Sequence, residues 1–189
     1  MPQDASHDLA LQVILAEFSA LRDEIKDRAA TAYTLLSINI TVTVAAAGFV
    51  LSDKADPRLL LLLPLTAPAL GMLFLDHALN INNIGGYINN NLRPLAVAAA
   101  RGAATESSKL LSFEMYVREY EKLRLRRILH GFPLILLFEG FPLAALIFCA
   151  KRLQHGWEWI LWAVGLAMVV TYLILWMLFL VHPRQEANK

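Results

Sequence analysis

Four long apolar runs alternate with polar segments along the chain. They cover residues 29–51, 58–75, 132–150 and 157–181, and the first contains no charged residue. A helix needs about 20 such residues to cross the hydrocarbon of a bilayer. A helix also satisfies its own backbone hydrogen bonds, as lipid requires. The pattern therefore predicts an all-α, polytopic membrane protein with four transmembrane helices, in pairs at 29–76 and 132–182.

The N-terminal polar segment carries helical periodicity. Residues 8–28 place apolar side chains at helical spacing with charges between them, namely Leu9, Val13, Phe18, Leu21 and Ile25. No helix breaker separates this segment from the first span. We expect one long helix that continues from an amphipathic segment, residues 1–28, into the membrane.

A polar stripe follows the second span, which itself contains Pro64 and Pro68 and is expected to bend. At 100° per residue the stripe comprises Asp76, Asn80, Asn83 and Tyr87, with His77 beside Asp76. A carboxylate and an imidazole at the end of a span can bind a cation or relay protons. The alternative is the wetted face of a helix at the membrane boundary. The glycine pair 85–86 weakens this helix, and the alanine-rich residues 95–106 are expected to form a loop or a poorly fixed helix.

Positive charge predicts the orientation. Thirteen of the 17 Lys and Arg residues lie in residues 1–28, 77–131 and 183–189, and the other four lie in or beside the two short turns. Basic residues accumulate on the cytoplasmic side of a membrane. Both termini and the central connection, residues 77–131, are therefore expected in the cytoplasm, with the protein in a bacterial plasma membrane. Three tryptophans (157, 159 and 162) would mark the outer interface, and Trp176 the inner one.

Composition narrows the classes of function. The chain is 57% hydrophobic with a mean hydropathy of +0.49, too apolar for an ordinary soluble fold. Its formal net charge of +1 gives no basic field for nucleic acid, and no nucleic-acid partner is expected. A basic cluster directly before the third span is expected to contact anionic lipid headgroups. The cluster comprises Lys122, Arg124, Arg126 and Arg127.

Glu139 lies near the middle of the third span, where a carboxylate costs at least about 2.5 kcal/mol to insert. It is either a proton or cation site or pore-lining group, or a neutral acid bonded to a neighbouring helix. Asn39 in the first span lies at a similar depth. The same depth in the fourth span predicts a shared intramembrane polar layer of Asn39, Glu139, Thr171 and Tyr172.

The first span also has a face of small residues, including Ser37, Thr41, Ala45 and Gly48. Small residues at this spacing let two helices approach closely in lipid. The face either packs within the monomer or forms the seam of a homo-oligomer.

No motif for catalysis is present. The chain lacks a Walker loop, a dinucleotide-binding glycine pattern and H-E-x-x-H, and has too few Cys and His for zinc. Glu139 has no second ionisable group beside it in sequence. No enzyme activity, catalytic residue, cofactor or metal is expected.

Two stretches carry a resemblance to known proteins. They are Glu17-x-x-x-Leu21-Arg22-x-Glu24-Ile25-x-x-Arg28 and Ile81-x-x-Ile84-Gly85-x-Tyr87-Ile88-x-x-x-Leu92-x-Pro94. Over about residues 15–95 the chain resembles a set of small, uncharacterised, four-span bacterial membrane proteins, mainly actinobacterial. Such relatives often carry a Gly-Trp-Glu element soon after the proline, and residues 95–106 lack it here. The resemblance implies the topology and no activity.

Three functions fit these features. The first is a non-enzymatic, homo-oligomeric pore or permeability effector, by analogy with four-span proteins of bacterial stress or phage defence. The second is a membrane-anchored scaffold whose cytoplasmic helices bind a protein partner. The third is a small proton-coupled transporter that uses Glu139.

Overall fold

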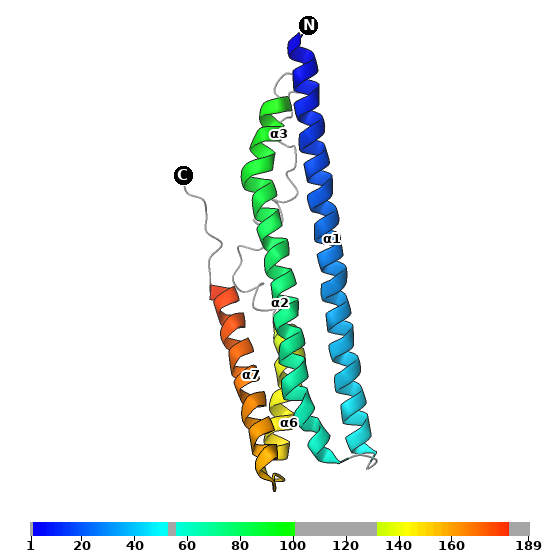
Figure 1. The fold of residues 1–189 in the computed structure, drawn as a ribbon, viewed down its shortest axis with the longest axis vertical. Helices are drawn as coiled ribbons and strands as arrows, with labels where there is room; N and C mark the ends of the chain where they lie inside the picture. Colours follow the sequence, from blue (N-terminus) through cyan, green and yellow to red (C-terminus); the bar gives the residue numbers. More distant parts are fainter. Residues whose placement is uncertain (1, 53–55, 101–131, 182–189) are drawn as a thin grey trace. The chain divides into compact units, whose positions relative to one another are not determined.

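The computed structural model describes residues 2–52, 56–100 and 132–181, and these residues form helices joined by short turns. Figure 1 shows the helices in chain order. Four of the helical stretches are long and apolar enough to cross a membrane, namely Asp8–Val50, Pro57–Ala99, Phe132–Ala150 and Gly156–Phe179. The predicted all-helical fold with four candidate spans is confirmed.

The chain divides into two compact units. The described residues of the first unit are 2–30 and 77–100, and those of the second are 31–52, 56–76 and 132–181. The first unit therefore holds the polar ends of two helices, whereas the second holds the most apolar parts of all four candidate spans.

The first helix, α1, runs without interruption over Pro2–Leu51, as the absence of a breaker predicts. The predicted apolar face is partly wrong in the first unit. Leu9 and Val13 are 63% and 59% exposed. The large apolar side chains that are half-buried here are Leu11, Ile14, Phe18, Leu21 and Ile25. These follow alternating steps of three and four residues and stay on one stripe, from which Leu9 and Val13 lie more than about 100° away around the helix.

The second helical stretch begins with η1, a 3-10 helix over Pro57–Leu62, and continues as α2 over Leu63–Tyr87. The side chain of Asp56 caps η1 by accepting a hydrogen bond from the Arg58 N–H at 2.9 Å. Pro64 has no N–H to offer the carbonyl of Leu60, four residues earlier. The Leu63 N–H bonds to Leu60 instead, which produces the tight final turn of η1.

In the first unit α2 is followed by η2, a π-helical turn over Ile88–Leu92, and by α3 over Arg93–Ala100. Of the two predictions for residues 95–106, the loop is wrong up to Ala100, where the chain is helical, because alanine is the strongest helix former. Residues 101–106 lie outside the described part. The helix continues through the glycine pair 85–86, and Ile88 and Leu92 are fully buried.

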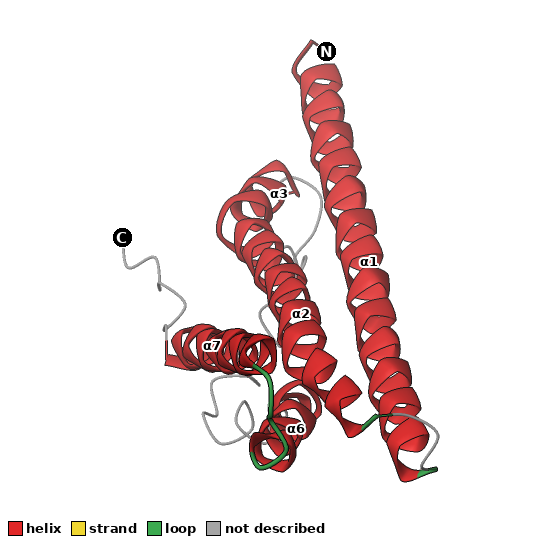
Figure 2. Ribbon diagram, turned by 60° about the horizontal axis from the view of Figure 1, so that its bottom comes forward, coloured by secondary structure: helices red, strands yellow, loops and turns green. Residues whose placement is uncertain are grey.

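The last two spans belong to the second unit. Residues 132–135 are helical and lead into η4, a π-helical turn over Leu136–Gly140, and then α6 over Phe141–Ala150. A short turn leads to α7 over Gly156–Val181. Figure 2 shows α6 beside α7, and α6 also contacts η1. The third and fourth spans thus form a helical hairpin against the start of the second.

Aromatic rings form the core of the second unit. The Tyr172 ring lies 6.0 Å from the Phe138 ring and 6.1 Å from the Trp176 ring, measured between centroids. Leu75 completes this buried cluster. Trp176 is only 4% exposed. Trp176 was predicted to present its ring at the inner membrane interface. It packs in the core instead.

Two glycines allow α2 and α7 to approach closely. A Cβ at Gly71 would lie 2.6 Å from Cε2 of Tyr172, and a Cβ at Gly165 would lie 3.0 Å from the Pro64 ring. Any side chain at Gly71 would overlap the buried tyrosine. These contacts hold the aromatic core against α2.

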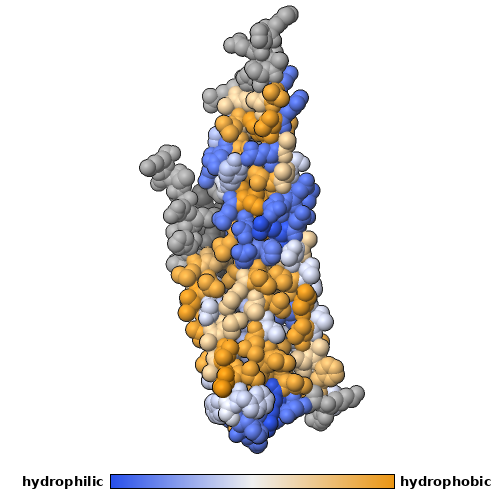
Figure 3. All heavy atoms as spheres, in the orientation of Figure 1, coloured by the Kyte–Doolittle hydropathy of each residue, from blue (hydrophilic) through white to orange (hydrophobic). Residues whose placement is uncertain are grey.

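The surface of the second unit is inverted relative to a soluble protein. Large apolar side chains are exposed, among them Ile147 at 71%, Met177 at 66% and Ile160 at 65%. Figure 3 shows an apolar face on this unit with polar residues gathered at its end. Hydrocarbon tails remove the penalty that water would impose on such a surface.

Candidate functional site

Polar side chains are buried inside the second unit at two levels. Asn39, Thr43 and Glu139 are 1%, 3% and 1% exposed and lie within the spans. Glu158 is fully buried at the end of the unit that holds the turns around residues 52–56 and 151–155, called the turn end below. The two levels differ in how their polar atoms are satisfied.

Asn39 repairs a hydrogen-bonding defect in the third span. In a π-helical turn each carbonyl accepts from the N–H five residues later. For Leu137 that residue is Pro142, which has no N–H. The Nδ2 of Asn39 donates to the Leu137 carbonyl at 3.2 Å instead. An amide from α1 thus replaces a backbone donor, which explains why an asparagine is buried in the first span.

Glu139 has no such partner. Both of its carboxyl oxygens are buried and make no hydrogen bond to the described residues. The hydroxyl oxygens of Tyr172 and Thr43 are in the same condition. Glu139 lies close enough to Tyr172 for the two to interact electrostatically. The second unit therefore contains a buried acid and a buried phenol that hydrogen bonds among the described residues leave unsatisfied.

Three of the four residues of the predicted polar layer are buried, and the fourth is exposed. Asn39, Glu139 and Tyr172 are all buried in the second unit. Thr171 is exposed, and its hydroxyl donates to the Ala167 carbonyl of its own helix at 2.8 Å, so it lies outside the layer. Thr43 was missed, although it follows Asn39 by one helical turn and therefore lies on the same face.

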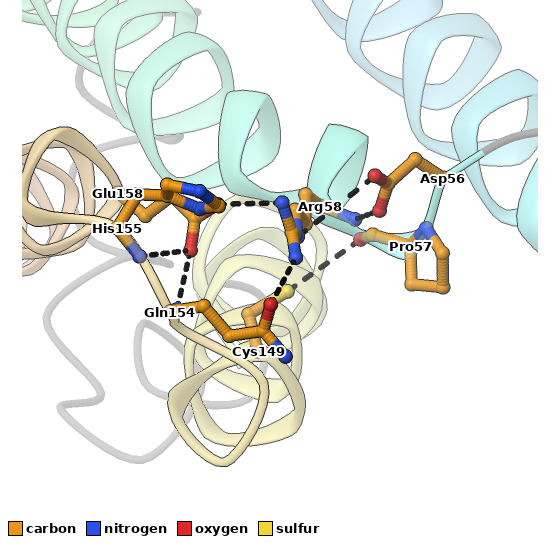
Figure 4. Close-up of polar contacts among 7 residues, drawn as sticks. All are labelled: Asp56, Pro57, Arg58, Cys149, Gln154, His155 and Glu158. Atoms are coloured by element: carbon orange, nitrogen blue, oxygen red, sulfur yellow. Dashed lines mark hydrogen bonds and ion pairs between the residues drawn. The ribbon is translucent and has the colours of Figure 1, made fainter.

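A second polar cluster, absent from the sequence prediction, surrounds Glu158 at the turn end (Figure 4). Its Oε2 accepts from the backbone N–H groups of Gln154 at 2.7 Å and His155 at 3.2 Å. Its Oε1 lies 2.8 Å from Nη1 of Arg58 and 3.1 Å from Nδ1 of His155. A buried carboxylate is stable with this many donors.

Arg58 links the elements that meet at the turn end. Its guanidinium also donates to the Gln154 side chain at 3.2 Å, and its backbone N–H to Asp56. Cys149 is buried and its Sγ lies 3.6 Å from the Pro57 carbonyl. The start of η1, the end of α6 and the start of α7 are therefore joined by polar contacts.

A sequence signal for this cluster existed. Glu158 is the third residue of α7, the position from which a glutamate reaches back to the N–H of the residue that precedes the helix. What the sequence did not reveal was its partner Arg58, which lies 100 positions earlier in the chain.

The residues of the predicted polar stripe after the second span differ in burial and belong to both units. Asp76 belongs to the second unit and is exposed, whereas His77 onward belong to the first unit. In the first unit Tyr87 donates to Glu17 Oε1 at 2.7 Å. The Nδ1 of His77 is buried without a hydrogen-bond partner among the described residues. Asn80 is half-buried and Asn83 is exposed.

The small-residue face of α1 is open in the second unit. Ser37, Thr41, Ala45 and Gly48 are all exposed, and a Cβ at Gly48 would meet nothing within 4 Å. Packing within the monomer was one of the two interpretations of this face. The described residues do not show it, because no described helix covers these side chains.

The basic cluster at Lys122, Arg124, Arg126 and Arg127 lies outside the described residues. Within the described ranges, no group of three or more His, Cys, Asp or Glu side chains could hold a metal ion.

Comparison of the chain with protein families, curated proteins and solved structures finds no match in any of the three.

Proposed function

We propose that this chain is a non-enzymatic membrane protein that self-associates through the small-residue face of α1 and forms a pore or permeability-changing assembly. Both termini and the central connection lie in the cytoplasm in this proposal, as the distribution of Lys and Arg favours. The assembly resides in a bacterial plasma membrane.

The exposure of α1 carries the proposal. Only 11% of its most apolar stretch is buried in the structure, against 39%, 33% and 22% for the other three candidate spans. The exposed side includes Ser37, Thr41, Ala45 and Gly48. In lipid, helices associate by packing small residues closely, because apolar area alone gives no advantage over lipid tails.

The hydroxyl groups on this face suit an interface or a wet pore. Ser37 Oγ donates to the Tyr33 carbonyl at 3.0 Å, and Thr41 Oγ1 donates to the Ser37 carbonyl at 2.9 Å. Each donor is satisfied within the helix, while each oxygen keeps acceptor capacity on an exposed face. A neighbouring helix or a column of water can use that capacity, whereas lipid tails cannot.

Cysteine crosslinking in vesicles tests the interface. Cys149, the only cysteine, is replaced by alanine, and Thr41→Cys is compared with Ile40→Cys. Residues 40 and 41 have similar depth and are both exposed, but they point about 100° apart. Disulfide-linked dimers are expected for Thr41→Cys and not for Ile40→Cys. Equal crosslinking at both positions would contradict the proposed interface.

Gly48→Leu gives a second test of the interface, designed to disrupt self-association without disturbing the packing within one protomer. A Cβ at Gly48 would meet nothing within 4 Å, so we expect a larger side chain to leave the packing within the protomer intact. We expect native mass spectrometry to show oligomers for the wild type and their loss for Gly48→Leu. A wild type that is strictly monomeric in nanodiscs would refute the pore.

Ion flux from liposomes separates a pore from a scaffold. Flux is expected from the wild type and reduced flux from Gly48→Leu. Oligomers without flux would favour the scaffold, in which the cytoplasmic helices bind a protein partner.

A further inference from the structure

Two buried glutamates in the second unit have opposite surroundings. Glu158 is surrounded by Arg58 and by backbone N–H donors, which stabilise an ionised carboxylate. Glu139 is 1% exposed, and neither of its oxygens has a hydrogen-bond partner among the described residues. The surroundings of Glu158 therefore favour an ionised carboxylate, whereas those of Glu139 favour a neutral carboxylic acid.

Within the described part of the second unit, no positive charge lies on the spans around Glu139. Residues 59–75 of the second span contain no ionisable side chain, and the first-span residues 31–51 contain only Tyr33, which is 69% exposed. In the third span the other ionisable group is Cys149, at the turn end. From α7 the nearby ionisable group is Tyr172, a phenol whose ring lies 6.0 Å from that of Phe138, the residue before Glu139. An unpaired carboxylate here is costly, whereas a neutral acid is not.

The helix around Glu139 is also specialised. Glu139 lies in the π-helical turn η4, and Asn39 supplies the hydrogen bond that this turn lacks because of Pro142. π-Helical turns inside α-helices occur frequently at functional sites. A dedicated donor from another span maintains the irregular turn that carries the acid.

From this arrangement we infer that Glu139 is a proton-binding site inside the bundle, with Tyr172 as the polar group that faces it. The ligand is a proton, held on the carboxyl group as a neutral acid. This site belongs to each protomer and does not depend on self-association through α1.

An apolar carbodiimide provides the test, because it enters membranes and reacts with protonated carboxylic acids. The acid proton moves to a carbodiimide nitrogen while the carboxyl oxygen bonds to the central carbon. The acyl group then migrates to nitrogen, so the whole reagent is added and nothing is oxidised. The full-length protein in lipid nanodiscs is treated with dicyclohexylcarbodiimide, and the labelled positions are identified by peptide mass spectrometry.

Glu158 is the internal control. We expect labelling at Glu139 to exceed labelling at Glu158 by at least about tenfold, since only Glu139 is uncharged. Glu139→Gln should abolish labelling of its peptide, and Glu158→Gln should leave labelling at Glu139 unchanged. Equal labelling of the two glutamates would overturn the inference. So would slowing of the Glu139 reaction by Na⁺ or K⁺ at constant pH, which would indicate a metal cation.

Infrared spectroscopy covers the case in which the reagent cannot reach the site. The wild type should show the carbonyl band of a neutral carboxylic acid that Glu139→Gln lacks and Glu158→Gln retains. If this band is present, an unlabelled Glu139 is an occluded proton site. If the spectra show Glu139 only as a carboxylate, the inference fails regardless of labelling.

Discussion

Gly71→Ala should destabilise the second unit, because the added methyl group has no room. Its Cβ would lie 2.6 Å from Cε2, 2.9 Å from Cζ and 3.1 Å from Cδ2 of Tyr172. Ordinary carbon contacts are about 3.5–4.0 Å, so the ring must retreat by roughly 1 Å. Tyr172 is completely buried between Phe138 and Trp176 and cannot retreat alone.

Two opposing effects determine the size of the loss. Overpacking of a tight core costs about 1–3 kcal/mol, and replacing glycine by alanine in a helix returns up to about 1 kcal/mol. We expect a net loss of about 1–2 kcal/mol for Gly71→Ala. Gly48→Ala should be neutral or slightly stabilising, since its Cβ meets nothing within 4 Å. Gly165→Ala, at 3.0 Å from Pro64, should fall between them.

The assay is reversible unfolding in mixed detergent micelles, followed by tryptophan fluorescence, to which Trp176 in the core contributes. Tyr172→Leu supplies the double-mutant test, because a smaller side chain should make Gly71→Ala less costly. The reasoning is refuted if Gly71→Ala is as stable as Gly48→Ala, or if its cost is unchanged when Tyr172 is leucine.

Two further changes probe the buried polar contacts by the same unfolding assay. Asn39→Leu leaves the Leu137 carbonyl without a donor and should lower the free energy of unfolding by about 1–3 kcal/mol. Pro142→Ala restores a backbone N–H, so the loss caused by Asn39→Leu should be smaller in that background. An undiminished loss would contradict the proposed role of Asn39. Glu158→Leu should destabilise the protein more than Glu158→Gln, because glutamine keeps a carbonyl for the N–H groups of Gln154 and His155 and loses only the ionic attraction to Arg58. Equal losses would show that the ion pair dominates.

The periodicity of apolar residues predicted where the helices lie, but it did not predict which face of each helix is buried. The uninterrupted course of α1 follows from the absence of proline and glycine before Gly48 and after Pro2. Leu9 and Val13 were nevertheless assigned to the wrong side, because apolar residues occur all around the N-terminal part and spacing alone does not show which neighbours a helix meets. Alanine-rich residues up to Ala100 are helical although a loop was one of the two expectations, because the high helix propensity of alanine prevails there.

The depth of Asn39 and Glu139 along their spans was readable from the sequence, because a helix rises by a constant distance per residue. The sequence did not reveal that Asn39 has a hydrogen-bond partner and that Glu139 has none among the described residues. Asn39 has a partner because Pro142 removes one backbone donor from a π-helical turn, and the turn type becomes visible only with the backbone. Thr171 and Tyr172 are neighbours in sequence, yet only Tyr172 enters the core, because consecutive residues lie 100° apart.

By itself, then, the sequence determined the membrane class, the four apolar helices and the presence of an acid within the third span, because bilayer thickness and backbone hydrogen bonding act on each segment separately. Only the tertiary structure decided which polar groups meet. Arg58 joins Glu158 across the turn end, while Glu139 is buried near Tyr172 with no counter-charge among the described residues of the unit. Such pairings depend on helix rotation and packing, and single glycines such as Gly71 control them by determining how closely two helices approach.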